Sequence, residues 1–288
     1  MTMTLGFSKA APSEVAGALD LTVQRSGVRT RPVKTEGSGV LRLMHPLYLD
    51  DSGQLTYIVV NPGGAYFGED YRMRVEVGEG ASLLLASQGA TRIYKTPHRP
   101  AVHDATFTLA AGSRLEYVPE QIIAYRDANY RQTTLIEAHP EAQAFMGEIV
   151  TPGWDPDDAR FTYAGMRLRV GVRSAGGAVC LDNVSIRPAH LGKAINGLGY
   201  LEGASHMGST LMVGPHAAGA FVDQVRDAVD AHGLNRAGVT AGVRHGVSWV
   251  MVRALADSTD ALRALILDVN EVDRSATTGQ GHLDLRRY

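Results

Sequence analysis

The sequence has 288 residues, of which 44% are hydrophobic and 20% charged, and 28 basic against 30 acidic residues give a formal net charge of −2. This balance argues against a general nucleic-acid binder, which needs a basic excess. No apolar run approaches the ~18–20 residues of a membrane span. The start of the chain lacks the layout of a signal peptide, and the single cysteine, Cys180, has no partner for an internal disulfide. We therefore expect a cytoplasmic globular protein without nucleic-acid or membrane partners.

Strand signals dominate residues 41–186. Residues 71–77 alternate strictly between apolar and charged side chains, which predicts a half-buried strand. Strand-like segments recur at roughly 10–15-residue spacing, which predicts layered sheets or a solenoid-like stack, with an ordinary sandwich as the alternative. No repeat of fixed length occurs, which argues against a regular repeat protein. Further strands are expected at residues 54–60, 82–86, 105–109, 114–118, 133–138, 145–150, 166–172 and 178–186.

Helix signals appear only late in the chain. Residues 217–232 carry an apolar stripe, and Gly233 follows as a helix-ending glycine. A second helix is expected after Ser258 or Thr259 as its N-cap, with a stripe formed by Leu262, Leu265, Ile266 and Val269. Strands at 238–244 and 247–256 separate the two helices. Residues 274–288 are polar and aperiodic, so we expect a mobile tail.

Familiar catalytic signatures are absent from the sequence. Gly63-Gly64-x-x-x-Gly68 lacks the dinucleotide-loop spacing and leads into a strand, so it is interpreted as a turn. Cys180 lies in an apolar run and is expected to be a buried, inert thiol. His98 and His103 flank a proline-containing loop, and with Asp104 they offer ligands for first-row divalent metals, nickel included. An exposed loop without a metal is the favoured interpretation of these histidines.

Polar residues also gather near several predicted strand ends. Thr91, Tyr94 and Lys95 follow the strand at 82–86, Glu120 follows the strand at 114–118, and Glu148 lies inside the apolar run 145–150. Acidic residues in such places belong either to solvated faces, which is the usual case, or to a buried polar path. The pattern alone leaves both interpretations open.

These segments, in this order, resemble the urease accessory proteins of the UreD family, called UreH in some organisms. The similarity spans about residues 27 to 267. Its motifs are Asn61-Pro62-Gly63-Gly64 running to Gly68-Glu69-Asp70, then Gly89-Ala90-Thr91-Arg92-Ile93-Tyr94-Lys95, then Leu115-Glu116-Tyr117-Val118-Pro119-Glu120, then residues 147–154, and finally residues 252–255.

The resemblance implies one domain over residues 1–288, with an ordered core at about 27–270. The implied fold is mainly β, with stacked sheets of β-helical topology and a small C-terminal helical part. The implied role is a non-enzymatic scaffold that binds a UreF-like protein, which recruits a UreG-like GTPase, and that docks on apo-urease. Nickel is then expected to pass transiently through an internal tunnel, with no tightly bound cofactor.

Carried onto this sequence, the resemblance implies a polar path for the cation. Carboxylates can hand a divalent cation along while water completes its shell, and a nearby lysine weakens binding by repulsion, so that transit sites do not become traps. His98 and His103 are weaker candidates for transient nickel ligation. The path residues implied are Glu69, Asp70, Thr91, Tyr94, Lys95, Glu120 and Glu148.

Two other classes of function remain open from the sequence. A metal-dependent hydrolase or lyase could use His98, His103 and Asp104, since a catalytic metal needs about three protein ligands and an open position. The other alternative is a β-sheet interaction module without a metal role. Metal-dependent turnover by the isolated chain would favour the enzyme, whereas activation of a separate nickel enzyme would favour the accessory role.

Overall fold

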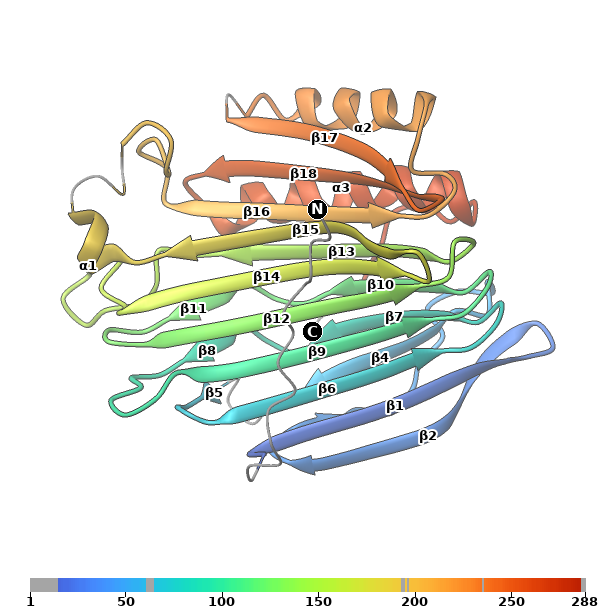
Figure 1. Ribbon diagram of the computed structural model, residues 1–288, viewed down its shortest axis with the longest axis horizontal. Coiled ribbons are helices and arrows are strands. Elements are labelled where there is room, and N and C mark those ends of the chain that lie inside the picture. The colour runs from blue at the N-terminus through green and yellow to red at the C-terminus, as the bar shows by residue number, and fades with distance from the viewer. Residues whose placement is uncertain (1–14, 61–64, 193–194, 196, 235, 286–288) are drawn as a thin grey trace.

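The computed structural model describes residues 15–60, 65–192, 195, 197–234 and 236–285, and its strands form two large sheets (Figure 1). In spatial order, the first sheet contains β15 (Gly177–Ile186), β14 (Gly165–Ser174), β12 (Asn129–Ala138), β9 (Ala101–Leu109), β6 (Asp70–Val77), β1 (Gly17–Ser26) and β2 (Arg29–Gly39).

The second sheet contains β17 (Ala237–Arg244), β18 (Val247–Ala256), β16 (His206–Val213), β13 (Gln143–Val150), β10 (Arg114–Val118), β7 (Ser82–Ser87), β4 (Leu55–Val60) and β3 (Arg42–Leu43). Three short strands belong to the same sheet off this path: β5 (Ala65–Tyr66), β8 (Thr91–Ile93) and β11 (Ile122–Ala124). The helices are α1 (Pro188–Leu191), α2 (Ala220–Ala231) and α3 (Thr259–Thr277).

The chain winds repeatedly from the first sheet to the second and back, as a solenoid. It passes from β6 to β7 and the short β8, returns to the first sheet at β9, and repeats the circuit through β10, β11 and β12. Equivalent strands of successive coils pair in parallel. The expected mainly β stack of β-helical topology with a small helical part is therefore confirmed.

The coils differ in length, which explains why the sequence has no fixed repeat. Leu55 pairs with Leu83, Leu83 with Leu115, and Leu115 with Ala144, at unequal separations along the chain. Stacking requires only that the inward-facing positions coincide, and the turns between strands absorb the extra residues.

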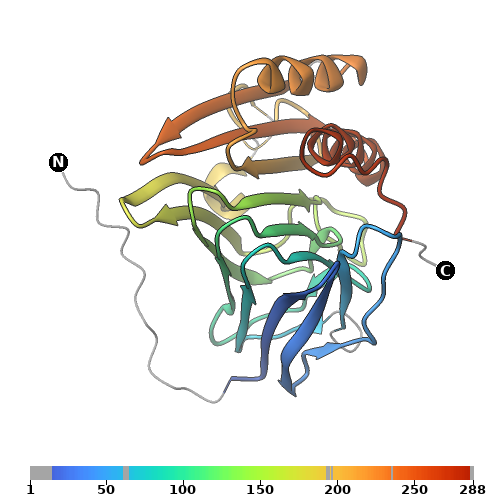
Figure 2. The same ribbon diagram turned by 90° about the vertical axis from the view of Figure 1, so that its right-hand side faces the viewer.

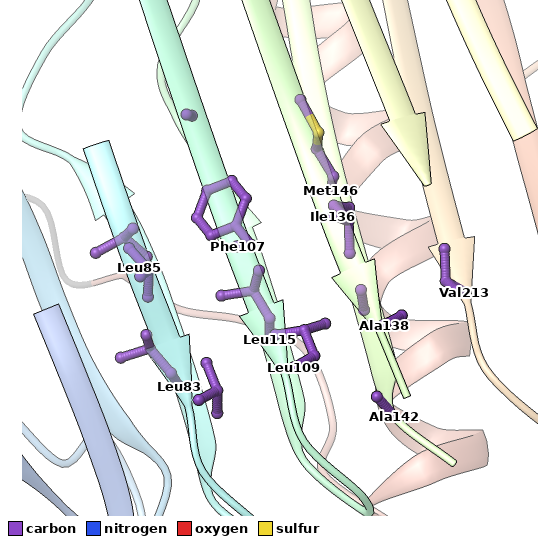
Figure 3. Close-up of a cluster of buried hydrophobic side chains, with 14 of the residues drawn as sticks. Leu83, Leu85, Phe107, Leu109, Leu115, Ile136, Ala138, Ala142, Met146 and Val213 are labelled. Carbon is purple, nitrogen blue, oxygen red and sulfur yellow. The ribbon is translucent and has the colours of Figure 1, made fainter. Parts of the chain in front are cut away.

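Apolar side chains fill the space between the two sheets (Figure 3). On the first sheet, residues at equivalent positions of successive coils form rows across the strands. Burying each large side chain contributes about 1.5–3 kcal/mol, so the rows are a main source of stability. One such row consists of Leu21, Val75, Phe107, Ile136 and Val172, each no more than 1% exposed.

Antiparallel hairpins cover both ends of the parallel part of the first sheet. They are β1–β2 at one end and β14–β15 at the other. The edge strand β2 is largely exposed, and Pro32 lies beside a register shift in its pairing with β1. Proline at a bulge or an edge strand blocks further strand addition. The sequence analysis missed β1, β2 and β16, although Leu19, Leu21 and Val23 alternate in β1 as a half-buried strand should.

Helices α2 and α3 lie on the face of the second sheet that points away from the first (Figure 2). Ser258 is the N-cap of α3, and its side chain accepts a hydrogen bond from the Ala261 amide, as expected. Gly147 on β13 allows the close approach of α3, because a Cβ atom there would lie 2.7 Å from Cγ2 of Ile266. None of the helices within the described ranges is long and apolar enough to cross a membrane.

The sequence analysis placed the start of the C-terminal tail, at residue 274, too early. Helix α3 continues to Thr277, so residues 274–277 belong to it and not to a tail, and the ordered core extends beyond residue 270. Arg274 is only 3% exposed, because its charge is paired inside the protein. Asp273 and Arg274 at this helix end are thus buried ion-pair partners, whereas Ser275 faces solvent. The expected turn at Asn61-Pro62-Gly63-Gly64 lies outside the described residues.

A buried network of charges joins α3 to the second sheet. Arg114 and Glu116 extend from β10 toward the helix, where Arg114 Nη2 lies 2.7 Å from Asp273 Oδ2 and Arg274 Nη1 lies 2.9 Å from Glu116 Oε2. Gln54 Nε2 donates to Glu116 Oε1 over 2.9 Å. The four charged side chains are at most 4% exposed. Removing one member would leave an uncompensated charge in the interior.

We therefore expect Glu116→Gln to lower the free energy of unfolding by about 3–5 kcal/mol, since it leaves two buried arginines with one carboxylate fewer. Urea unfolding followed by circular dichroism measures this change. Glu76→Gln on the exposed side of β6 is the control and should change stability by less than about 0.5 kcal/mol. Equal stabilities of the two variants would contradict a structural role for the network.

Candidate functional site

One level of the solenoid interior is lined by polar side chains from both sheets. Tyr71, His103 and Gln132 lie opposite one another on β6, β9 and β12, at inward-facing positions. Glu148 on β13 faces them, and Gln132 Nε2 donates a hydrogen bond to Glu148 Oε2 across the interior. Tyr130 Oη donates to Gln132 Oε1 over 2.9 Å and lies 3.4 Å from His103 Nδ1. A connected polar line thus runs from His103 to Glu148.

Burial moves the pKa values of the two titratable ends of this line in opposite directions, and both shifts favour the neutral form. Burial raises the pKa of Glu148 to about 7, although the hydrogen bond from Gln132 opposes that rise. Burial also lowers the pKa of His103 to about 4, which keeps its imidazole neutral at neutral pH. Near pH 7, Glu148 therefore exchanges between the acid and the carboxylate, and His103 offers a nitrogen lone pair.

Two cavities border this line, and an outer groove shares wall residues with the first of them. The outer groove has a volume of about 450 Å³ and lies between α3, the C-terminal segment and the end of β10. The inner cavity, of about 40 Å³, lies between the two sheets. The second cavity, of about 20 Å³, lies beyond Glu148. The inner cavity is lined by Leu41, Val59, Tyr66, Met73, Ala86, Ser87, Thr91, His103, Tyr117, Pro119, Glu120, Ile122, Gln132 and Glu148.

Neighbouring hollows share wall residues. Pro119 and Glu120 line both the outer groove and the inner cavity, and Glu148 lines both the inner and the second cavity. A water molecule needs about 10–15 Å³ of such volume, so each hollow can hold at least one water or a small cation. The hydroxyl of Thr210, which lines the second cavity, has no hydrogen-bond partner among the described residues.

An arginine faces the carboxylate at each end of this series. Arg263 Nη2 on α3 lies 2.6 Å from Glu120 Oε2 at the outer groove. Arg253 on β18 pairs with Asp182, which lines the second cavity. The sequence analysis gave no site role to either arginine or to Asp182, because nothing in the local pattern indicates which carboxylate a distant arginine will reach.

The structure brings Thr91, His103, Glu120 and Glu148 together around the inner cavity. The exposed-loop interpretation of His103 was wrong. Strand β9 begins at Ala101, so His103 occupies an inward position and is 7% exposed. Asp104 lies on the opposite, outward face, as alternation along a strand requires. The two residues therefore do not form a common ligand pair.

The other predicted path residues lie outside the walls of these three hollows. Glu69 is exposed and its Oε2 accepts a hydrogen bond from Tyr71 Oη over 3.1 Å. Asp70 pairs with Arg99, and Lys95 Nζ lies 2.8 Å from Asp127 Oδ2. His98 is exposed in the loop after β8. Tyr94 belongs to an aromatic row on the surface.

This aromatic ladder consists of Phe67, Tyr94, Tyr125 and Trp154. The ring centroids of successive members are 5.3, 4.7 and 4.9 Å apart. The first three follow β5, β8 and β11, and Trp154 forms a parallel bridge with Tyr125, so each coil contributes one ring. Phe67 and Trp154 are 51% and 50% exposed. Exposed aromatic groups of this size are typical of surfaces that contact other proteins.

The sequence matches the model of the UreD urease accessory protein family over residues 15–287. Urease accessory protein UreD of Actinomyces naeslundii is 43% identical over 273 residues, which cover 94% of this chain and 98% of that protein. The protein of the same name from Arthrobacter sp. (strain FB24) is 42% identical, with 94% of each chain covered. Its namesake from Corynebacterium glutamicum is 32% identical over 96% of this chain and 99% of that protein.

The raised pKa of Glu148 predicts a pH dependence of stability. In the unfolded chain the Glu148 carboxyl ionises near pH ~4.3, whereas in the folded protein it keeps its proton up to about pH 7. The wild type should therefore lose stability as the pH rises between these values, by on the order of 3 kcal/mol, and Glu148→Gln should not. Urea unfolding of both proteins from pH 4.5 to 8 measures the difference. A difference that is constant over this range would contradict the buried carboxyl.

Proposed function

The chain belongs to the UreD family of urease accessory proteins, and on that premise we propose that it is a non-enzymatic scaffold that delivers nickel to apo-urease through its series of neighbouring hollows. Its partners in this role are a UreF-like protein, a UreG-like GTPase and apo-urease itself. The observation that supports nickel delivery is the series of hollows that share Glu120 and Glu148 as wall residues.

The groups along the series suit the transfer of Ni²⁺ as a cargo. Glu120, His103, Glu148 and Asp182 offer carboxylate oxygens and a neutral imidazole, which first-row divalent cations accept. Each hollow presents few of these groups, so water completes the coordination shell of the cation and no hollow binds it tightly. A pKa of about 7 for Glu148 lets this residue exchange a proton for a cation near neutral pH.

Arg263 and Arg253 favour release of the cation from the two ends of the series of hollows. While Glu120 is paired with Arg263, a cation that approaches the carboxylate must compete with the guanidinium. Asp182 is paired with Arg253 at the other end in the same way. Like-charge repulsion between arginine and nickel lowers the residence time at both ends, which favours passage over storage.

Partner binding is assigned to the aromatic ladder. Its exposed members, Phe67 and Trp154, are large amphipathic contacts of the kind that dominate binding energies. Ion pairs border the ladder, among them Lys95 with Asp127 and Arg126 with Asp155. A polar rim around an apolar centre is the usual anatomy of a protein interface.

The enzyme alternative receives less support from the geometry. A hydrolase or lyase built on His98, His103 and Asp104 requires these ligands to converge on one metal. His98 is exposed, His103 is buried, and Asp104 lies on the outward face of β9. The three groups therefore do not face a common space. A metal-free interaction module would explain the aromatic ladder but not the polar line through the interior.

Nickel delivery is tested by urease activation in cells that co-express urease and the accessory proteins under limiting nickel. We expect Glu148→Gln to slow activation about tenfold, because it removes an anionic ligand from the path without changing the shape of the side chain. Glu141→Gln, on an exposed turn between β12 and β13, is the matched control and should activate at the wild-type rate.

If Glu148→Gln activates urease like the wild type while nickel is limiting, the path assignment is wrong. Retention of partner binding by each variant must be checked by co-purification, so that a loss of activation reports on nickel and not on assembly.

The role of the aromatic ladder is tested by size-exclusion chromatography with the UreF-like protein and with apo-urease. We expect the wild type to co-elute with its partner and Trp154→Ala to lose at least about 2 kcal/mol of binding free energy toward one of the two. Val33→Ala on the exposed edge strand β2 is the control and should bind normally. Unchanged binding of Trp154→Ala to both partners would remove the ladder from the interface.

A further inference from the structure

A second group of metal-ligating side chains lies outside the inner and second cavities, on the helical side of the protein. Asp268 and Glu271 on α3 and His282 in the following segment each place one ligand atom within 4.8 Å of the other two. His282 Nδ1 lies 3.3 Å from Glu271 Oε2. His232, after the end of α2, has its Nε2 2.8 Å from Asp268 Oδ2.

The helix fixes the two carboxylates side by side. Asp268 and Glu271 are three residues apart on α3, so they project from the same face one turn from each other. Two negative charges in this arrangement repel, and a cation between them relieves the repulsion. His232 holds Asp268 from the other side, in the way that neighbouring hydrogen bonds orient metal ligands.

The segment after α3 brings His282 back to these carboxylates independently of any cation. Gly279 has a positive φ of 71°, which lets the chain reverse at the helix end. Arg274 Nε then donates to the carbonyl of Gly281 over 2.9 Å, and Leu283 is 3% exposed in the core beneath the helices. His282 thus lies between two anchored residues, and its position is fixed before a ligand arrives.

We propose that Asp268, Glu271 and His282 form a surface site for a first-row divalent cation. Two carboxylate oxygens and one imidazole nitrogen suit such a cation, and three protein ligands leave positions for water. The side chains are about half exposed, at 52%, 46% and 53%, so that a hydrated cation can reach them from solvent. Partial exposure also allows a bound cation to exchange with solvent.

The position of His282 suggests what this site does. His282 lines the outer groove, and so does Glu120, which also lines the inner cavity. A cation held at this site is therefore at the outer end of the series of hollows, where it can be loaded. This loading role rests on the proposed function, in which nickel is the cargo; the cation site itself does not.

The site is tested by isothermal titration of the purified full-length chain with Ni²⁺. We expect Glu271→Gln and His282→Ala each to weaken binding at one site by at least about tenfold relative to the wild type. The matched control is the double variant His139→Ala with Glu141→Gln. It removes a comparably exposed histidine–carboxylate pair, 4.0 Å apart, that belongs to no three-ligand group among the described residues. This control should keep wild-type affinity.

Wild-type Ni²⁺ affinity and stoichiometry in both site variants would overturn the proposal. Difference spectra with Co²⁺ give a second readout, since visible ligand-field bands that depend on His282 and Glu271 report direct coordination and do not depend on urease. Circular dichroism of the variants ensures that the comparison is made between folded proteins.

Urease activation separates the loading role from the delivery role. Under limiting nickel, His282→Ala should slow activation, and excess nickel should restore it. Wild-type activation by His282→Ala together with slow activation by Glu148→Gln would overturn the loading role and leave nickel delivery intact. Wild-type activation by both variants would count against delivery itself, and the titration would then decide the cation site alone.

Discussion

Parallel stacking of the coils sets each inward-facing side chain beside its equivalents in the neighbouring coils, and the other features of the protein depend on this register. It forms the apolar row of Val75, Phe107 and Ile136 in the core. Nearer the start of the same strands, it also aligns His103 with Gln132 and so begins the polar line to Glu148. A slip of one residue in any coil would turn these side chains to the opposite face. The same constraint that builds the core therefore builds the candidate path.

The buried charges between β10 and α3 add a second constraint, because they fix the helix that closes the outer groove. Separating a buried ion pair carries a large free-energy cost, so α3 cannot shift easily relative to the sheet. Arg263 and the segment that carries His282 both depend on that helix. Because the interior holds the walls of this groove, its ligand groups keep their places without a bound cation, as the proposed transient handling of nickel requires.

Local patterns predicted the elements whose burial follows a simple period. The alternation at residues 71–77 and the stripe of Leu262, Leu265 and Ile266 correspond to a half-buried strand and a helix packed on a sheet. Local sequence patterns failed where contacts with residues distant in the sequence determine the position of a side chain. Gln132 looks like an ordinary strand residue, and its pairing with Glu148 depends on the register between coils of unequal length. His103 was assigned to a loop because prolines precede it, although the strand begins only two residues earlier.

The central claim is that a divalent cation passes through the interior beside Glu148. The most direct measurement is X-ray diffraction at the nickel absorption edge from crystals of the full-length chain, alone or with its partner, after equilibration with Ni²⁺. The account predicts an anomalous peak in the inner cavity, within bonding distance of Glu148 and adjacent to Gln132 and His103. Nickel bound only at surface groups, with an interior that stays free of anomalous density at the same metal concentration, would contradict it.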